Sequence, residues 1–476
     1  MPGVINLADP PYNVTCNYSA DISSAVNAAI SAVNSSGYAR ATLLLPGGLC
    51  LVTAGININA GTFTLKGAGK DVTTLVHSGT TGNTITVQGS AFDIILQDFS
   101  IAQQMGDTPT AGYGVEETQA TNVSLRNMRI QGVYVGAAAV NTGVSGVMTI
   151  ESVDFGNTVL DAVYANGVSQ LFMSEVTSYQ SAQQTNGGAC IHLNAAAAYI
   201  QNTTCGQSTY GLLINPTFGN SVVDVFATNL ELDLSQQDGV KIDGTNGSVY
   251  NIKLTNVRSG FSSGNGFNFI GTGVSHVSLI GCSAESSTLV GINVQYLADS
   301  VISGCLVEGN SYTVRGGFNG INLINGSGLV VANNRSGPYP GKTNNQGYGL
   351  AIQNTFTGGP LTVSHNILTE NVIGPIFYGN PANKAILVEE NSTELGLTAR
   401  VMWPALGTSP WSYTAGPTPT TLILVNYVCS ALQINGTGNN IFPLSNSGSL
   451  AIPLLAYQSL TGTCTTMPSN VTAIIQ

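Results

Sequence analysis

Charged residues are scarce in this chain. They make up 8% of its 476 residues, with 13 Lys and Arg against 24 Asp and Glu, for a formal net charge of −11. A protein that binds duplex nucleic acid needs clustered cations to contact the phosphates. The composition therefore argues against duplex nucleic acid as a partner, and we expect no nucleic acid but a neutral or weakly acidic ligand.

Long apolar runs are missing as well. The chain has no stretch of about 18 consecutive apolar residues, the length that a membrane-spanning helix needs. Its N-terminus does not combine a basic start with an apolar segment, as a signal peptide would. We therefore expect no membrane insertion and no signal peptide.

Residues that favour helices, such as Lys, Glu and Arg, are also few, whereas uncharged polar residues are plentiful. Glycine alone accounts for 57 positions, and Ser, Thr and Asn are abundant. Small polar and β-branched residues favour strands, and Gly and Asn favour turns. The composition therefore indicates stacked strands and turns.

Twelve short segments repeat one pattern, in which an apolar residue is followed two positions later by a small or turn-forming polar residue. Examples are "LRNMRI" from Leu125, "LTNVRS" from Leu254 and "VANNRS" from Val331. Neighbouring copies lie 23 to 32 residues apart. So regular a spacing indicates an internal structural repeat.

A second series lies between these segments and places a small residue before alternating apolar positions, as in "CIHLN" from Cys190 and "GVKID" from Gly239. Each repeat thus carries at least two short strands joined by turns. A coil of this size cannot bury its apolar face alone, so it must stack on its neighbours. We predict an all-β fold, a right-handed parallel β-helix of about 12 coils.

Asparagine recurs at the turn position of the first series, at Asn127, Asn202, Asn229, Asn256 and Asn333. Asparagine tolerates left-handed backbone angles. We expect each of these amides to bond to the side chains of the coils above and below.

The segment Asp21 to Val52, "DISSAVNAAISAVNSSGYARATLLLPGGLCLV", followed by "LKGAG", resembles the start of the pectate-lyase-like β-helix superfamily. The resemblance implies an amphipathic helix that closes the first coil. Asp21 or Ser19 would cap this helix, and one face would carry apolar residues. That face contains Val26, Ala29, Ile30 and Val33. We place the capping helix and first strands at residues 19–60 and the β-helix at 61–400.

The repeat stops near residue 400, and residues 401–476 contain short apolar runs between Pro, Gly and Asn turns, typical of an antiparallel β-sandwich. The segment that contains "SPWSYTAG" and "TLILVNYVCSALQINGTG" is similar to the terminal domains of phage tailspikes and receptor-binding proteins. That resemblance implies a homotrimer located in the phage virion, with residues 1–18 as a peptide that attaches to a tail adaptor protein. A secreted protein is the alternative.

Outward positions of the second series should form a polar strip with one aromatic ring. Amides and a ring of this kind suit a chain of sugar hydroxyls. The residues expected to bind substrate are Glu116, Tyr164, Asn166, Asn194, Asn215, Asn268 and Asn293.

Charged side chains gather in part of the strip, and the catalytic candidates are Asp161, His192, Asp238, Lys241 and Asp243. Glycoside hydrolysis needs two carboxyls about 5–9.5 Å apart, whereas β-elimination needs a base such as Lys241 or His192. A purely structural role in turns is open for Asp238 and Asp243. The polygalacturonase motifs and the calcium-binding aspartate cluster of pectate lyases are absent, so we expect no metal or other cofactor.

Three functions follow from these patterns. The first is a tailspike that binds a bacterial surface polysaccharide and cleaves it, by hydrolysis in preference to elimination. The second is a carbohydrate-binding spike without catalysis. The third is a free-standing bacterial polysaccharide lyase or hydrolase.

The eight cysteines are expected to be free buried thiols. Cys282 and Cys305 should stack in successive coils, at a separation that would also permit a disulfide. A bridge between Cys429 and Cys464 is an open alternative in the C-terminal region.

Overall fold

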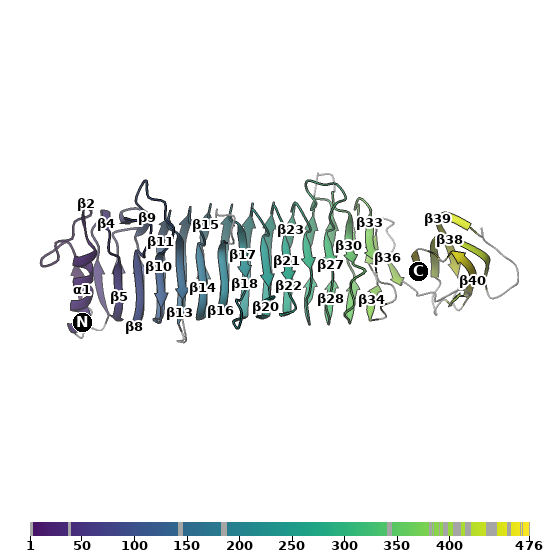
Figure 1. Cartoon of the computed structure of the whole chain (residues 1–476), viewed down its shortest axis with the longest axis horizontal. Helices are drawn as coiled ribbons and strands as arrows, with labels where there is room; N and C mark the ends of the chain where they lie inside the picture. The colour runs from purple at the N-terminus through teal and green to yellow at the C-terminus, as the bar shows by residue number, and fades with distance from the viewer. Residues whose placement is uncertain are drawn as a thin grey trace.

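The computed structural model describes residues 3–36, 40–140, 146–181, 188–339, 345–379, 383, 385–389, 391–393, 398–402, 411–414, 420–434, 445–454, 458–466, 468 and 470–475. Within these ranges the chain forms one helix, α1 (Ser23–Ser36), followed by a long stack of short strands. Figure 1 shows the stack running from the helix end to a separate group of strands near the C-terminus.

Three parallel sheets, here called faces A, B and C, make up the stack, and each turn of the chain visits them in that order. Face A contains β1 (Val4–Asn6), β3 (Ala41–Leu44), β6 (Phe63–Lys66), the second part of β8 (Ile85–Gln97), the first parts of β11 (Thr121–Gln131) and β13 (Val147–Gly156), the second part of β14 (Val163–Ser174), the middle of β16 (Ala189–Gly206), the first parts of β18 (Ser221–Asp233) and β20 (Ser248–Gly260), β22 (Val274–Ile280), β25 (Val301–Ser303), β28 (Leu329–Ala332), β31 (Leu361–Ser364) and β34 (Ile386–Glu389).

Face B contains β2 (Asn17–Asp21), β4 (Gly48–Val52), β7 (Thr73–His77), β9 (Ser100–Gln103), the ends of β11, β13, β16, β18 and β20, and β15 (Thr177–Tyr179), β23 (Ser283–Glu285), β26 (Leu306–Glu308), β29 (Arg335–Gly337), β32 (Ile367–Leu368) and β35 (Asn391–Thr393). Face C contains β5 (Ile56–Gly61), the starts of β8, β14 and β16, and β10 (Tyr113–Thr118), β12 (Val135–Val140), β17 (Tyr210–Ile214), β19 (Val240–Asp243), β21 (Phe267–Ile270), β24 (Ile292–Val294), β27 (Ile321–Leu323), β30 (Tyr348–Ile352) and β33 (Gly374–Tyr378).

The predicted parallel β-helix is confirmed, with about one turn more than the twelve that the repeat indicated. Equivalent positions of the repeat lie directly beside one another; for example, Leu254 pairs with Ala227 on one side and Leu279 on the other. All three are fully buried. Along each strand, successive side chains therefore point alternately into the core and outward.

The corners of the coils use left-handed residues, as predicted. Asn202, Asn229 and Asn256 have φ values of 49°, 56° and 52°. The amide of Asn229 donates to Asn202 at 3.2 Å, and that of Asn256 donates to Asn229 at 2.7 Å. Each corner is thus held to the corner of the preceding coil.

Helix α1 closes the first coil. Val26, Ala29, Ile30 and Val33 are all buried, which confirms the predicted apolar face. Of the two proposed caps, Asp21 accepts hydrogen bonds from the backbone and hydroxyl of Ser23, at 3.1 and 2.6 Å. Burial alone would raise the pKa of Asp21, but these bonds, together with one from Thr53, lower it.

The segment assigned to attachment contributes to this end of the stack. Strand β1 pairs with β3 and β2 pairs with β4, while Leu7 and Val14 enter the core. Residues 4–18 therefore form part of the first coil, and an attachment role for residues 1–18 stays a proposal.

The C-terminal region is antiparallel, as predicted. It contains β36 (Thr398–Met402), β37 (Trp411–Thr414), β38 (Thr420–Ile434), β39 (Ser445–Leu454), β40 (Ser459–Thr466) and β41 (Asn470–Ile475). The long strand β38 pairs with β39, β40 and β41 around a core that includes Leu422, Leu432 and Ile452. Parts of the predicted region 401–476 lie outside the described residues.

The expectation of free thiols is wrong for six of the eight cysteines, and the alternative bridge between Cys429 and Cys464 is present. Disulfides join Cys16 to Cys50, Cys190 to Cys205, and Cys429 to Cys464. Cys190 and Cys205 lie on different faces, and a repeat pattern does not show which thiols of different faces meet, whereas Cys429 and Cys464 are direct partners on β38 and β40. Cys282 and Cys305 are free, buried and stacked, as expected.

Removing the central disulfide should destabilise the protein. Cys190 and Cys205 are 15 positions apart in the sequence, and a loop of that size predicts a loss of about 3 kcal/mol in the Cys190→Ala/Cys205→Ala variant. Denaturant-induced unfolding followed by circular dichroism measures it. Reductant should lower the midpoint of the wild type more than that of the variant; an equal response would contradict the prediction.

No helix in the described part of the chain is long and apolar enough to cross a membrane.

Candidate functional site

The residues of face C that alternate with its core positions form one continuous row along the stack, in which Glu116, Tyr164, His192 and Lys241 are partly exposed and the other members are buried. Successive strands pair these residues directly: Glu116, Ala138, Tyr164, His192, Leu213, Lys241, Asn268, Asn293 and Asn322. We call this set the face C row. Stacking thus brings together five of the predicted substrate-binding and catalytic side chains between Tyr164 and Asn293, whereas Glu116 lies further toward the N-terminus.

His192 is the centre of a hydrogen-bonded group on face C. It donates from Nδ1 to Asp161 at 3.3 Å and from Nε2 to the side-chain oxygen of Asn215 at 2.6 Å. Its ring centroid lies 4.9 Å from that of Tyr164, whose hydroxyl accepts a bond from Asn194 at 3.2 Å. Five predicted residues therefore belong to one cluster.

The two acceptors control the charge of His192. Burial alone would lower its pKa, but the hydrogen bonds to Asp161 and Asn215 and the negative charge of Asp161 raise it above the ordinary value. Both ring nitrogens must donate, so the protonated form fits this arrangement. A protonated imidazole cannot act as a base, and its two N–H groups are already engaged by Asp161 and Asn215.

Asp161 and Asp238 occupy the corners before their face C strands and bind backbone there. Asp161 accepts the backbone N–H of Ala189 at 2.6 Å. Asp238 accepts the backbone and side-chain N–H groups of Asn265, at 2.7 and 2.9 Å, and the amide of Asn268 at 2.8 Å. These contacts give each buried carboxylate a structural task, and their catalytic assignment stays a prediction.

Lys241 and Asp243 lie on one strand, 3.4 Å apart, with less than a quarter of each side chain exposed. The Lys241 ammonium also lies 5.6 Å from the centre of the Tyr210 ring. A side chain held by both a carboxylate and a ring is well placed to contact a ligand. Asn166 is the next alternate residue of β14 after Tyr164, and it is half-buried.

The amides of the row form a chain of their own. Asn293 donates to Asn268 at 3.0 Å, and Asn322 donates to Asn293 at 2.9 Å. Each primary amide has two donors and two lone pairs. One donor and one lone pair of the central amide, Asn293, are therefore not used within this chain of amides, and the side chain is largely buried.

Glu116 is half-buried and bonded to Asn83 at 2.6 Å. Burial raises its pKa, and the hydrogen bond only partly offsets that effect. Several coils separate it from Asp243, so the two carboxylates do not form a pair within this chain.

Sequence reasoning missed a second charged cluster on face B. Arg258 contacts Glu231 at 3.0 Å, Asp233 at 3.5 Å and Glu285 at 3.0 Å. Glu285 and Glu308 lie directly opposite each other on adjacent strands. Two carboxylates are thus placed on neighbouring coils.

The pKa values of this cluster differ from those of free carboxyls. Burial raises the pKa of Glu308, the charge of Glu285 adds to the rise, and Arg335, 3.5 Å away, opposes it. Burial also raises the pKa of Asp233, although Arg258 lowers it in part. Asp233, Glu285 and Glu308 share the sixth position after the first apolar residue of the repeat, a signal that could have found them.

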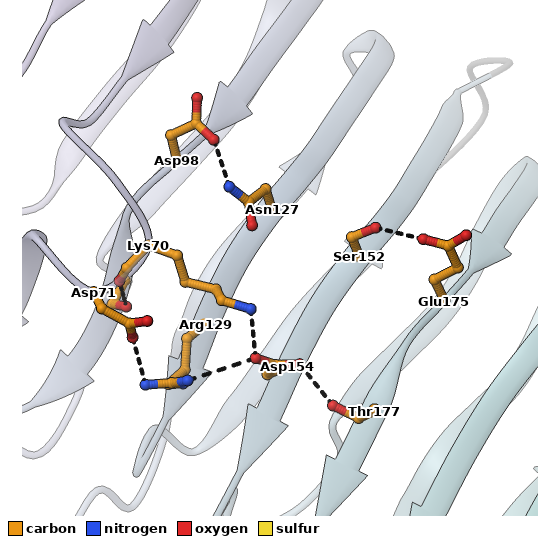
Figure 2. A network of polar contacts seen from close by, with 10 residues as sticks. Lys70, Asp71, Asp98, Asn127, Arg129, Ser152, Asp154, Glu175 and Thr177 are labelled. Atoms are coloured by element: carbon orange, nitrogen blue, oxygen red, sulfur yellow. Dashed lines mark hydrogen bonds and ion pairs between the residues drawn. The ribbon is translucent and has the colours of Figure 1, made fainter.

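A third group of charges, on the N-terminal part of face B, joins distant coils (Figure 2). Asp154 accepts from Lys70 at 2.7 Å and from the Thr177 hydroxyl at 2.7 Å. Arg129 lies 3.7 Å from Asp154 and 2.7 Å from Asp71. The group connects the turn at residues 70–71 to the face.

Asp154→Asn should weaken the protein only above acidic pH. Burial would raise the pKa of Asp154, but Lys70, Thr177 and Arg129 lower it below 3.8. A carboxyl whose pKa is lower in the folded state stabilises the fold at pH values above its unfolded-state pKa. That stabilisation is lost as the pH falls through its folded-state pKa. With a third of the side chain exposed, we expect about 1 kcal/mol at pH 7. Urea unfolding of the wild type and the variant at pH 7 and pH 3 measures this loss of stability. An equal difference between the two proteins at both pH values would contradict the prediction.

Among the described residues, no group of three or more His, Cys, Asp or Glu side chains could hold a metal ion.

Residues 210–395 match the family model described as right handed beta helix region. Tailspike protein 3 of bacteriophage CBA120 is 13% identical to the chain with a TM-score of 0.56, and the match covers 86% of this chain and 65% of that one. The tailspike of E. coli bacteriophage HK620, solved in complex with a pentasaccharide, is 10% identical with a TM-score of 0.54, covering 96% and 93%.

The A-module of mannuronan C-5 epimerase AlgE4 from Azotobacter vinelandii is 13% identical with a TM-score of 0.49, covering 82% of this chain and 97% of that module. No curated protein sequence matches the chain. The predicted resemblance to right-handed β-helix proteins, tailspikes among them, is confirmed at the level of the fold.

Proposed function

We propose that this protein binds a bacterial surface polysaccharide along the face C row. The observation that carries the proposal is the direct strand-to-strand alignment of Tyr164, His192, Lys241, Asn268 and Asn293. A repetitive polymer fits a repetitive row of amides, cations and one ring, because each coil offers a similar contact. The pentasaccharide complex of a tailspike with the same fold supports this reading.

We also propose that the protein is a homotrimeric phage tailspike that contacts a tail adaptor through its N-terminal residues. The shared fold with two phage tailspikes supports it. Light scattering tests the assembly, since a trimer of 49.0 kDa chains would have three times that mass. A monomeric mass would contradict the proposed trimeric tailspike. A secreted polysaccharide-binding protein would then be the better description.

Substitutions on the face C row should weaken binding. Tyr164→Ala removes the ring and the hydroxyl that Asn194 contacts, and Lys241→Met removes the ammonium group of the row. We expect each to lower affinity at least about tenfold, since one buried hydrogen bond to a charged group contributes about 1.5–3 kcal/mol. Titration calorimetry against purified host polysaccharide measures the change.

The control is Thr204→Ala, on an exposed position of face B. It should bind as the wild type does. If Tyr164→Ala and Lys241→Met also kept wild-type affinity, face C would not be the binding surface.

Cleavage is a second candidate function, favoured by one observation on face B. Glu285 and Glu308 lie on adjacent strands, and parallel strands are about 4.8 Å apart. Retaining glycosidases use two carboxyls about 5–5.5 Å apart, one of them with a raised pKa. Glu308 would be the acid and Glu285, held by Arg258, the carboxylate that attacks or stabilises the sugar cation.

The catalytic candidates of face C remain the alternative. There His192 would donate a proton and Asp243 would accept one. Reducing-end release from host polysaccharide tests cleavage itself, and binding without release would leave a carbohydrate-binding spike. An unsaturated product that absorbs ultraviolet light would indicate elimination.

A further inference from the structure

Face A carries a ladder of aromatic side chains that the proposed function does not use. Phe172, Tyr199 and Phe226 pair directly on successive strands and point outward, between residues that enter the core. The ring centroids of Phe172 and Tyr199 are 5.1 Å apart with planes 13° apart; those of Tyr199 and Phe226 are 5.3 Å and 17° apart. Tyr199 is 39% exposed.

A row of uncharged polar side chains runs parallel to the ladder. Ser174, Gln201 and Thr228 also pair directly on the same three strands. Between the two rows lies a trough of about 370 Å³, lined by residues of both. We call it the face A trough. Its volume is within the range of small-molecule sites, roughly 300–1,000 Å³.

The polar groups of the trough are available to a ligand. In the part of the chain that the structure describes, no hydrogen bond engages the Tyr199 hydroxyl or the side chains of Ser174, Gln201 and Thr228. A side wall of free amide and hydroxyl groups offers neutral donors and acceptors. Such groups match sugar hydroxyls better than they match charged peptide or phosphate.

The aromatic wall is held in place before a ligand arrives. Each ring stacks on the next, and the Lys253 ammonium lies 5.1 Å from the centre of the Phe226 ring at one end of the ladder. Stacked rings lose little conformational freedom on binding, so less affinity is lost to ordering. The two walls also match the two kinds of surface on a sugar. The C–H groups of the sugar ring face can pack on the aromatic wall, and its hydroxyls can bond to the polar wall.

We propose that the face A trough is a saccharide subsite spanning about three coils, separate from the face C row. It would take a short run of neutral sugars, and Lys253 would accept an acidic substituent at one end. The inference rests on the proposed function, because it assigns a second contact surface to the same class of ligand.

The test compares three single variants with the wild type. Tyr199→Ala removes the middle of the aromatic wall, and Gln201→Ala removes the central amide. Tyr250→Ala is the matched control, since Tyr250 is an equally exposed tyrosine of face A, at 45%, outside the trough. An array of bacterial capsular and O-antigen oligosaccharides identifies the tightest glycan, and calorimetry with that glycan measures affinity.

We expect Tyr199→Ala and Gln201→Ala each to lower affinity at least tenfold and Tyr250→Ala to change it less than twofold. Circular dichroism and the thermal midpoint show whether each variant folds. Gln201→Ala truncates an exposed side chain and serves as the test if Tyr199→Ala does not fold. Wild-type affinity in both trough variants, with binding lost in Tyr164→Ala, would overturn the trough and leave the proposed function standing.

Two other results would overturn the proposal in different ways. No binding of any glycan by the wild type would remove both the proposed function and the trough. A change of mass in light scattering for Tyr199→Ala, with unchanged glycan affinity, would show that a second copy of the chain occupies the trough.

Discussion

Asn366→Ala is expected to lower the free energy of unfolding by about 3–5 kcal/mol, because several buried partners lose their hydrogen bonds together. Asn366 is fully buried. Its amide donates to the carbonyl of Val331 at 3.0 Å and to Asn391 at 2.8 Å, and its oxygen accepts from the backbone and side chain of Asn334, at 3.0 and 2.9 Å. Unfolding in guanidinium chloride, followed by circular dichroism, measures the loss.

Asn229→Gly is the matched control for this prediction. It also removes an amide from a ladder, where Asn229 bonds to Asn202 and Asn256, but the side chain is exposed and glycine accepts the positive φ. We expect a change below about 1 kcal/mol, because water replaces the lost bonds. A similar loss in both variants, or less than 1 kcal/mol for Asn366→Ala, would show that the interior amides are not what holds these coils in register.

Glu308→Gln is expected to lower reducing-end release by about 10²–10⁴-fold, the usual contribution of a general acid or base, with glycan affinity within about threefold of the wild type. The amide has the shape of the acid but no proton to give to the leaving oxygen. Glu285→Gln should have an effect of similar size, because Arg258 would then hold a neutral group in place of the carboxylate. Reducing-sugar release over time measures both.

Stability gives an independent check on Glu308→Gln. Burial raises the pKa of Glu308 because it makes the charged carboxylate costly. The free energy of unfolding therefore falls as the pH rises through the pKa of Glu308 in the folded state. The neutral amide removes that cost, and the variant should be at least as stable as the wild type at pH 8. Lost activity would then not be a result of unfolding.

Asp243→Asn and His192→Gln distinguish the two faces. If cleavage occurs on face B, both variants should release sugar at nearly the wild-type rate when the polysaccharide is saturating. His192→Gln, which changes the proposed binding row and loses the bonds to Asp161 and Asn215, should then raise KM alone. If instead Asp243→Asn stops release and Glu308→Gln does not, the reaction belongs to face C.

The repeat was enough to predict the coil, its corners and the direction of most side chains. Leu125, Leu254 and Val331 are buried where the pattern placed them, and Asn229 has the predicted left-handed angle. Alternation has an unambiguous period in a strand, and a coil has no other way to hide its apolar side. The alignment of Tyr164, His192 and Lys241 followed from the same regularity.

Contacts between faces were not predictable in the same way. The repeat shows that Asp161 and Asp238 precede a strand, but not that a corner carboxylate accepts the backbone N–H of the next coil. It also does not show which thiols meet across the interior, as Cys190 and Cys205 do. These outcomes depend on where the chain bends, which is set by three-dimensional packing.

The direct pairing of equivalent positions has a consequence for how such a chain changes its length. Leu279 and Ile302 are neighbours in register and are separated by one whole circuit of the backbone. Excising that circuit would join two compatible surfaces, whereas excising one residue within a strand would turn the side chains beyond it to the opposite face of the sheet. The span offered to a ligand can therefore grow or shrink only in whole-turn increments, each of which adds or deletes one complete set of contacts.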